Sequence, residues 1–254
     1  MTARPTVSLI VIARDEERLI GQCLRSAASF CNEMIVVDSL STDRTVQIAK
    51  ELGARVFEQE FTDYVRQKQI ALDHATSQWV LLLDADEQAT YALGREIEDV
   101  VSAPDAADGY RVQRVLYHLG HYYTRPIYRD RPVRLFRRER GHIGGVDPHD
   151  KVIVGGRVGW LNSPILHFSY RDISDHVATI NRFSTRAAAE IKPSALSAIR
   201  MFTHPLWRFI NFYIVRGGFR DGGRGLYAAM TAAFYVFLKY AKVYERRLKT
   251  LHPR

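Results

Sequence analysis

Residues 79–87, WVLLLDADE, carry the clearest sign of the chain's architecture. The five apolar residues 79–83 run without a break into Asp84 and Asp86. A continuous apolar run closed by charge is typical of a strand buried on both faces of a parallel sheet. Open α/β sheets bind ligands at this end of their strands, and a divalent metal carrying a nucleotide diphosphate would relieve the repulsion between the two carboxylates. The pattern is short, and it also fits a solvated turn after a core strand.

Apolar runs alternate with stretches of helical spacing along the N-terminal third of the chain. Strands are expected at 7–13, 34–37, 55–57 and 79–83, and helices at 19–28, 46–52 and 64–74. Ser41 or Thr42 is expected to cap the second helix, and Gly53 to end it. Charged residues follow the first, second and fourth strands. This order predicts an α/β fold, a mostly parallel sheet with helices on both faces.

Glycine-rich phosphate motifs are missing from the sequence. No G-x-G-x-x-G follows the first strand, which weakens the case for a dinucleotide site. No G-x-x-x-x-G-K-[ST] occurs anywhere, which excludes a P-loop. A phosphate bound here must therefore be held by metal and side chains.

Three segments resemble a known family: SLIVIARDEERLIGQCLRSA at 8–27, IVVDSLSTDRTVQIAKELGA at 35–54, and WVLLLDADE. In order and spacing they are similar to the inverting GT-A glycosyltransferases of family 2, within the branch of bacterial lipopolysaccharide-core β-glucosyltransferases. The close resemblance covers about residues 6–90, and a looser one continues to about residue 190. It implies a GT-A fold, with a Rossmann-like sheet that binds a UDP-sugar.

The resemblance also implies which residues bind the donor. The nucleotide-sugar would contact Ile12, Ala13, Arg14, Asp38, Lys68, Asp84 and Ala85. Asp38 would accept a hydrogen bond from the base, and Asp86 would ligate a divalent metal, Mg²⁺ or Mn²⁺. His167 stands where some relatives have a further metal ligand, although a lone histidine is more often a core or interface residue. Lys68–Gln69 replaces the Arg-Asn of many relatives, and the first loop reads Arg-Asp-Glu-Glu at 14–17 where many relatives have Asn before the Glu pair.

An inverting transfer also needs a base that takes the proton of the attacking hydroxyl on the face opposite the leaving diphosphate. The glycine-rich segment 141–152 is the best source, because glycine permits close approach to a ligand. Asp150 follows a histidine, which resembles the His-Glu pair of the branch, and is our choice. Asp147 is the second choice, and it could instead cap a turn before Pro148. Glu87 could orient a ligand of the metal or the acceptor, or simply begin the next helix.

Residues 111–140 contain nine arginines, and five tyrosines are interleaved at positions 110–128. Arginine recognises phosphate and tyrosine stacks on sugar rings, so a lipid-linked or phosphorylated glycan acceptor explains the mixture. No RNA-binding signature is present, and we expect no nucleic-acid partner. For most of these arginines, a solvated face with structural ion pairs is an adequate explanation.

The net charge of +8 lies in the C-terminal part of the chain. Residues 201–254 hold ten Lys/Arg and two Asp/Glu, so residues 1–200 are neutral overall. The apolar stretch 226–238 is too short to span a bilayer, which needs about 20 residues. Five cations follow it on what is expected to be the same helix: Lys239, Lys242, Arg246, Arg247 and Lys249. Together with the aromatic stretch 206–215, they suit attachment to an anionic membrane surface. Alternatively, these helices bury against each other or join subunits of a homo-oligomer.

We therefore expect a GT-A domain at 1–195, with a donor half at 1–90 and an acceptor half at 91–195, and a helical membrane-associating segment at 196–254. Met1 to Pro5 leads straight into the first strand, and two cysteines suggest a reducing compartment, so the expected location is cytoplasmic, at the inner face of the cell membrane. Two other classes remain open. A haloacid-dehalogenase-type hydrolase also places Asp-x-Asp at a strand end, and a basic membrane- or RNA-binding adaptor could retain a degenerate nucleotide site.

Overall fold

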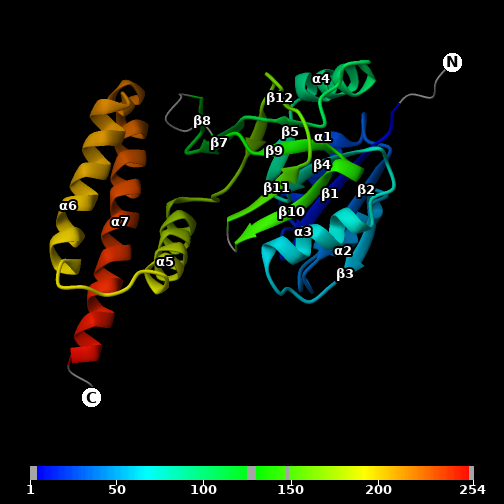
Figure 1. The fold of residues 1–254 in the computed structure, drawn as a ribbon. Helices are drawn as coiled ribbons and strands as arrows, with labels where there is room; N and C mark the ends of the chain where they lie inside the picture. Colours follow the sequence, from blue (N-terminus) through cyan, green and yellow to red (C-terminus); the bar gives the residue numbers. More distant parts are fainter. Residues whose placement is uncertain (1–4, 125–129, 147–148, 252–254) are drawn as a thin grey trace. The chain divides into compact units, whose positions relative to one another are not determined.

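The computed structural model describes residues 5–124, 130–146 and 149–251 (Figure 1). Within these ranges the chain forms two compact units. Residues 5–117, 122–124 and 130–169 belong to the first unit, and residues 118–121 and 170–251 to the second. The candidate site residues that the structure describes all lie in the first unit.

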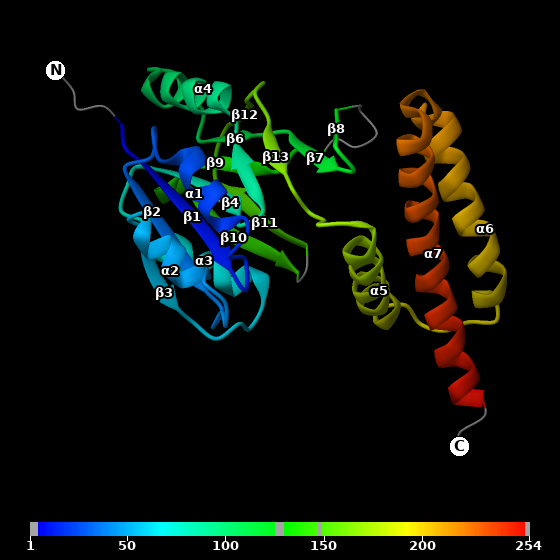
Figure 2. The ribbon, with the colours of Figure 1, turned by 180° about the vertical axis from the view of Figure 1, so that it is seen from behind.

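A seven-stranded sheet is the framework of the first unit (Figure 2). Its order is β12 (Val158–Trp160), β6 (Gly109–Arg111), β9 (Val133–Arg137), β4 (Trp79–Asp84), β1 (Val7–Ala13), β2 (Glu33–Asp38) and β3 (Arg55–Glu58). β4, β1, β2 and β3 are parallel, whereas β9 runs antiparallel to both of its neighbours. The mostly parallel α/β fold and the order of its first four strands are as the sequence predicts.

Both faces of the sheet are covered, because alternate strand residues point to opposite sides. On one face Leu9 and Val11 pack in a core with α1 (Ile20–Ala27), α2 (Thr45–Glu51) and α4 (Tyr91–Ser102). On the other face Ile10 packs with α3 (Tyr64–Asp73) and with the hairpin of β10 (Gly141–Val146) and β11 (His149–Val154). Because both faces of the sheet are buried, the strand sequences are unbroken apolar runs.

A smaller four-stranded sheet follows the order β5 (Glu87–Ala89), β13 (Ile165–His167), β7 (Arg114–His118) and β8 (His121–Tyr123). A short 3₁₀ turn, η2 (Arg138–Arg140), joins β9 to β10. Antiparallel pairing of β13 with β5 sets His167 opposite Glu87. The second sheet therefore brings residue 167 to the end of β4.

The expected cap of α2 is wrong. The helix begins at Thr45, and its N-cap position, Arg44, makes no side-chain capping bond. Asp43 accepts the Thr45 N–H instead, at 2.9 Å. Ser41 is used elsewhere, since its hydroxyl donates to Asp38 at 2.5 Å and accepts the Asp15 N–H at 2.8 Å.

The second unit contains three helices, α5 (Ile173–Ala189), α6 (Ser197–Ile210) and α7 (Gly222–Leu251). The π-turn η3 (Asn211–Val215) and the 3₁₀ turn η4 (Gly218–Asp221) join α6 to α7. Gly217 and Gly222 have φ of 75° and 57°, a left-handed backbone that favours glycine, so the chain can reverse here. The cations at 239–249 do continue the helix that starts before residue 226. None of the helices in the described ranges is both long and apolar enough to cross a bilayer.

Candidate active site

Strand register gathers the expected donor residues at one edge of the large sheet. Ala13 lies opposite Asp38 on β2, and Ile12 lies opposite Asp84 on β4. Ala85 follows directly and is buried. These residues therefore form a continuous row across the C-terminal ends of three parallel strands, the usual position of a ligand site in such sheets.

The loops after β1 and β2 are tied together beside this row. Asp38 is fully buried and accepts the Ser41 N–H at 2.7 Å. Asp15, at φ 53°, accepts the Thr42 N–H at 2.8 Å. Arg14 extends outward, with its Nε 3.8 Å from the Asp15 carboxylate. The two loops thus form one rigid rim around Asp38.

Asp84 lies among three cations. Its carboxylate is 2.9 Å from Lys68 Nζ, 2.8 Å from Arg134 Nη2 and 3.7 Å from Arg114 Nη1. Burial alone would raise the pKa of Asp84, but the charges of Arg134 and Lys68 outweigh it and hold the pKa well below its usual range. Asp84 is therefore ionised and held in place, which is not the state of a residue in a solvated turn.

Glu87 is a buried carboxylate that shares two arginine partners with Asp84. It is fully buried, accepts the Asp84 N–H at 3.0 Å, and contacts Arg134 Nη2 at 2.7 Å and Arg114 Nη1 at 3.2 Å. Burial raises the pKa of Glu87, an effect that the two arginines only partly offset. The reading of Glu87 as a helix start is wrong, because α4 begins at Tyr91 and is capped by Thr90. Its position beneath the Asp84–Asp86 loop makes it a support of that loop.

Asp86 and His167 meet at the same edge. His167 Nε2 is 3.2 Å from Asp86 Oδ2, and the Phe168 N–H donates to the Asp86 carbonyl at 2.9 Å. Burial lowers the pKa of His167, but the hydrogen bond and charge of Asp86 outweigh it and raise the pKa. An imidazole and a carboxylate this close can share a divalent cation in place of the proton. His167 is thus more than a core residue: it faces the second aspartate of the Asp-x-Asp motif.

Two protein ligands suit a metal that also binds substrate phosphates. Among the described residues, no group of three or more His, Cys, Asp or Glu side chains could hold an ion by itself. Mg²⁺ and similar hard cations commonly use one or two carboxylates together with substrate phosphate oxygens. Asp86 supplies one such carboxylate and His167 an imidazole nitrogen 3.2 Å from it, so the pair could hold a divalent metal that is completed by a nucleotide diphosphate.

Lys68 links the donor edge to the candidate base. Its ammonium lies 2.8 Å from Asp150 Oδ2 as well as 2.9 Å from Asp84 Oδ1. The next residue of α3, Gln69, accepts the Ile143 N–H at 2.9 Å and so fixes β10. Lys68 and Gln69 together position the β10–β11 hairpin, and with it Asp150, next to the Asp-x-Asp strand. Asp147 lies outside the described residues.

Arg114 and Arg134 contact Asp84 and Glu87 of the candidate site, but the sequence pattern does not distinguish them from the other arginines of 111–140. Arg134 is 3% exposed, and the buried Nε atoms of both arginines have no hydrogen-bond partner among the described residues. The signal was local: Arg134 interrupts the apolar run Val133–Phe136, and an arginine in a buried strand requires a partner.

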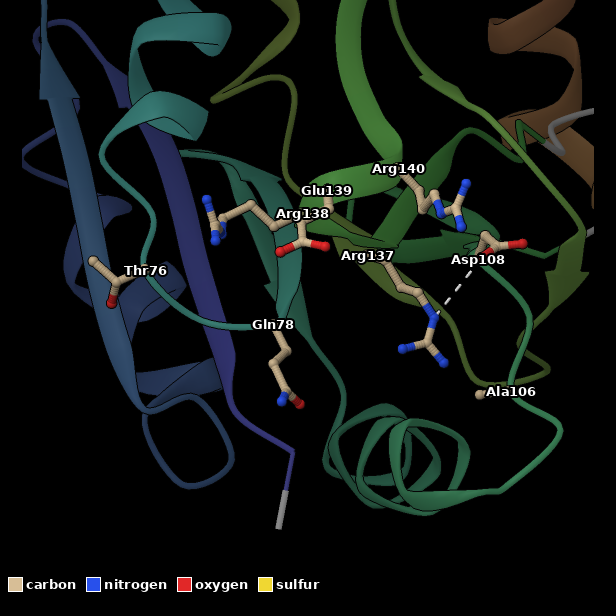
Figure 3. A pocket seen from close by; sticks show the side chains of 8 residues that line it. All are labelled: Thr76, Gln78, Ala106, Asp108, Arg137, Arg138, Glu139 and Arg140. Atoms are coloured by element: carbon tan, nitrogen blue, oxygen red, sulfur yellow. Dashed lines mark ion pairs between the residues drawn. The ribbon is translucent and has the colours of Figure 1, made fainter. Parts of the chain in front are cut away.

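A separate cavity of about 550 Å³ lies near the N-terminal end of β4, away from the strand ends that carry the aspartates (Figure 3). Gln78 on its wall directly precedes β4, and Arg137 pairs in register with Trp79, the first residue of that strand. Figure 3 shows Arg137 turned toward Asp108, and their Nε–Oδ1 distance is 3.9 Å. None of the expected site residues lines this cavity, so the acidic edge, and not this cavity, is the candidate active site.

Comparison with known proteins agrees with this geometry. The sequence model of glycosyl transferase family 2 matches residues 8–153. The chain is 31% identical over 266 residues to the lipopolysaccharide core biosynthesis glycosyltransferase LpsC of Rhizobium meliloti, covering 100% of this chain and 97% of LpsC. It is 30% identical to an uncharacterized glycosyltransferase of Rickettsia typhi, over 96% of this chain and 88% of the relative. Among solved structures, residues 1–349 of TarS from S. aureus match with a TM-score of 0.50 and 13% identity, over 98% of this chain and 93% of that one.

The chain belongs to glycosyltransferase family 2 and is a glycosyltransferase with a GT-A-like fold. The resemblance found in the sequence is confirmed. The two alternative classes, a haloacid-dehalogenase-type hydrolase and a non-enzymatic adaptor, are therefore wrong.

Proposed function

We propose that this glycosyltransferase moves a hexose, glucose in the first instance, from a UDP-sugar to a hydroxyl of a lipopolysaccharide-core or related envelope glycan, with inversion at the anomeric carbon. The observation that carries the proposal is the meeting of two pairs at one sheet edge. Asp86 with His167 suits a metal–diphosphate, and Lys68 with Asp150 sets a carboxylate beside it. The name of the full-length relative LpsC supports the acceptor class.

The donor would lie along the row of strand ends. Ile12, Ala13 and Arg14 would line the base and ribose, and Asp38 would accept a hydrogen bond from the base edge. Asp84 and Ala85 would face the ribose, while Lys68, already between two carboxylates, would also contact a phosphate. The rigid rim around Asp38 supports this role, because a preorganised acceptor loses little entropy on binding.

Asp86 and His167 would hold a divalent metal, Mg²⁺ or Mn²⁺, which when bound supplies positive charge to the diphosphate as it leaves. The Asp84–Arg134–Glu87 network orients Asp86 by fixing the loop that carries it. Arg114 closes the same network through Glu87.

Asp150 would accept the proton of the acceptor hydroxyl. As that oxygen forms its bond to the anomeric carbon, the bond from that carbon to the diphosphate breaks, and UDP departs with the electron pair. Lys68 acts as a positioning residue, because its ammonium holds the Asp150 carboxylate 2.8 Å away and keeps it near Asp84. Asp147 is the alternative base.

The acceptor class suggests where the enzyme works. A lipid-linked, phosphorylated glycan at the inner face of the cell membrane suits a basic protein, and we place the enzyme there as a peripheral protein. We also propose that 1–195 performs the transfer, with 1–90 binding the donor and 91–195 the acceptor, while 196–254 attaches the protein. A homo-oligomer through the C-terminal helices is the alternative use of that segment.

A transfer assay tests the proposal. Purified protein is incubated with Mn²⁺, a panel of radiolabelled UDP-hexoses and lipopolysaccharide-core acceptors of defined length, and the product linkage is read by NMR. We expect transfer from one UDP-hexose, with inverted anomeric configuration. Asp150→Asn should lower the rate of transfer by about 10² to 10⁴ but retain donor binding. Asp99→Asn, which changes an exposed carboxylate on α4, should not change the rate. Retained configuration, or full activity of Asp150→Asn, would contradict the mechanism.

A further inference from the structure

The turn that joins α6 to α7 exposes several large apolar side chains, and this exposure continues along α6 through Ile199 and Phe202. We call residues 206–226 the hairpin tip. Within it, Leu206 and Trp207 are each 62% exposed, Val215 is 65% exposed, and Ile214 and Phe219 are at least half exposed. Large apolar side chains exposed together in one short segment indicate an interaction surface.

Other residues of the hairpin tip pack inside the helical unit. Phe212 and Gly218 are buried, and Gly225 allows the start of α7 to approach the Gly218 carbonyl, where a Cβ would collide. The exposed side chains are therefore not those that hold α6 and α7 together. They remain available after the hairpin has formed.

Positive charge is concentrated at the same place. Arg208, Arg216, Arg220 and Arg224 are all exposed, and Asp221 is the one acidic residue of the hairpin tip. Aromatic, aliphatic and arginine side chains together are typical of protein segments that lie in the interface of an anionic bilayer.

Two of the five cations expected from the sequence to contact a membrane bind within the helical unit instead. Lys242 Nζ donates to the Asn181 carbonyl at 2.7 Å, and Arg246 Nη1 donates to the Ala188 carbonyl at 2.6 Å, so both bind the C-terminal part of α5. Lys249 pairs with Glu245 at 2.7 Å. The distal half of α7 thus uses Lys242 and Arg246 to stabilise the helical unit, and the hairpin tip lies at the other end of this helix.

We infer that the hairpin tip docks into the surface of an anionic lipid bilayer. Trp207, Val215 and Phe219 enter the headgroup region, and the arginines bind lipid phosphates. A second copy of the chain is a poorer occupant, because two tips face to face would bring eight arginines against two aspartates. The inference deepens the proposed function by assigning its membrane contact, but the binding itself requires neither donor nor metal.

Vesicle binding by the full-length chain tests the inference. Trp160→Phe removes the other exposed tryptophan, so that a change in indole emission reports on Trp207, while Trp79 is buried. We expect binding to vesicles of 70% phosphatidylcholine and 30% phosphatidylglycerol, a blue shift of the emission, and quenching by brominated lipids. Pure phosphatidylcholine vesicles should bind far less.

Charge-matched variants locate the contact. Arg208→Gln with Arg216→Gln should weaken vesicle binding about 25-fold, about fivefold for each cation near the surface. Arg247→Gln with Lys249→Gln removes the same charge about 37 Å along α7 from its start, beyond the screening length, and should change binding less than threefold. Trp207→Ser with Val215→Ser should abolish the binding while circular dichroism stays unchanged, because neither side chain is buried.

Three results would overturn the inference. One is no binding of the wild type to the anionic vesicles. Another is equal weakening by the tip pair and the distal pair. The third is a dimer in which Trp207 is shielded from acrylamide without lipid, which would assign the tip to a second copy. Transfer to a water-soluble acceptor fragment is measured in parallel, so loss of vesicle binding and loss of catalysis are distinguished.

Discussion

Replacing Arg134 by methionine is the perturbation that probes the buried ion network most directly. Arg134 is 3% exposed and contacts two carboxylates, Asp84 at 2.8 Å and Glu87 at 2.7 Å. Methionine fills a similar volume without the charge, and it leaves a fully buried Glu87 with Arg114 as its nearest cation. Breaking one side of a buried ion pair costs about 3–5 kcal/mol. Because Lys68 and Arg114 remain, we expect a value near the lower limit, a fall in Tm of roughly 6–12 °C.

The assay is urea unfolding followed by circular dichroism across a pH range. Burial already raises the pKa of Glu87 above its ordinary 4.5, and loss of Arg134 raises it further. A carboxyl whose pKa is higher in the folded chain contributes stability that is present below pH 4.5 and is lost as pH rises through the folded pKa. The deficit of Arg134→Met relative to wild type should therefore shrink as pH falls from 8 toward 5.

Two further variants decide the interpretation. Glu87→Gln, added to Arg134→Met, removes the buried carboxylate that has lost its arginine partner. The free energy of unfolding should then rise by at least about 1 kcal/mol. Arg95→Met, on an exposed i,i+3 pair with Glu98, should change stability by less than about 0.5 kcal/mol. Wild-type stability of Arg134→Met, or a deficit that neither acid nor Glu87→Gln relieves, would refute the reasoning.

Three other predictions follow from the same geometry. Asp150→Asn should lower kcat by about 10² to 10⁴ while the Kd for UDP with Mn²⁺ changes less than threefold; an unchanged kcat would exclude Asp150 as the base. Mn²⁺-dependent UDP binding should weaken as pH falls through the raised pKa of His167, because the proton competes with the metal, and His167→Asn should flatten this dependence in calorimetry. Gly94→Ala should cost about 1–3 kcal/mol in urea unfolding, because its Cβ would lie 2.6 Å from the Phe30 ring, and a stability within 0.5 kcal/mol of wild type would show that the ring yields freely.

The fold could be predicted wherever local pattern and tertiary environment agree. Residues 79–83 read as a buried strand because β1 and β9 flank it and helices cover the sheet on both faces. The cap of α2 could not be predicted in the same way. Ser41 has the chemistry of a cap, but its hydroxyl binds Asp38 and the backbone of Asp15, which is 26 residues away in the chain.

The sequence predicts the aspartates of the candidate site but not the arginines that contact them. Asp38 and Asp84 end strands and Asp86 follows two residues later, so local pattern alone suggests them. Arg114 and Arg134 were not distinguished from the surrounding arginines, because their partner Glu87 lies 27 and 47 residues away and only the folded sheet brings them together. The same holds for Lys242 and Arg246 of α7, whose partners on α5 are about 60 residues distant.

Calorimetric binding of UDP, with and without Mn²⁺, to the wild type and to Asp86→Asn tests the central claim most directly. The account predicts that the wild type binds UDP with Mn²⁺ at least tenfold more tightly than without it, and that Asp86→Asn loses this gain while its thermal unfolding is unchanged. Metal-independent binding of UDP, or equal Mn²⁺ enhancement in both proteins, would contradict the assignment of Asp86 as a metal ligand at the donor site.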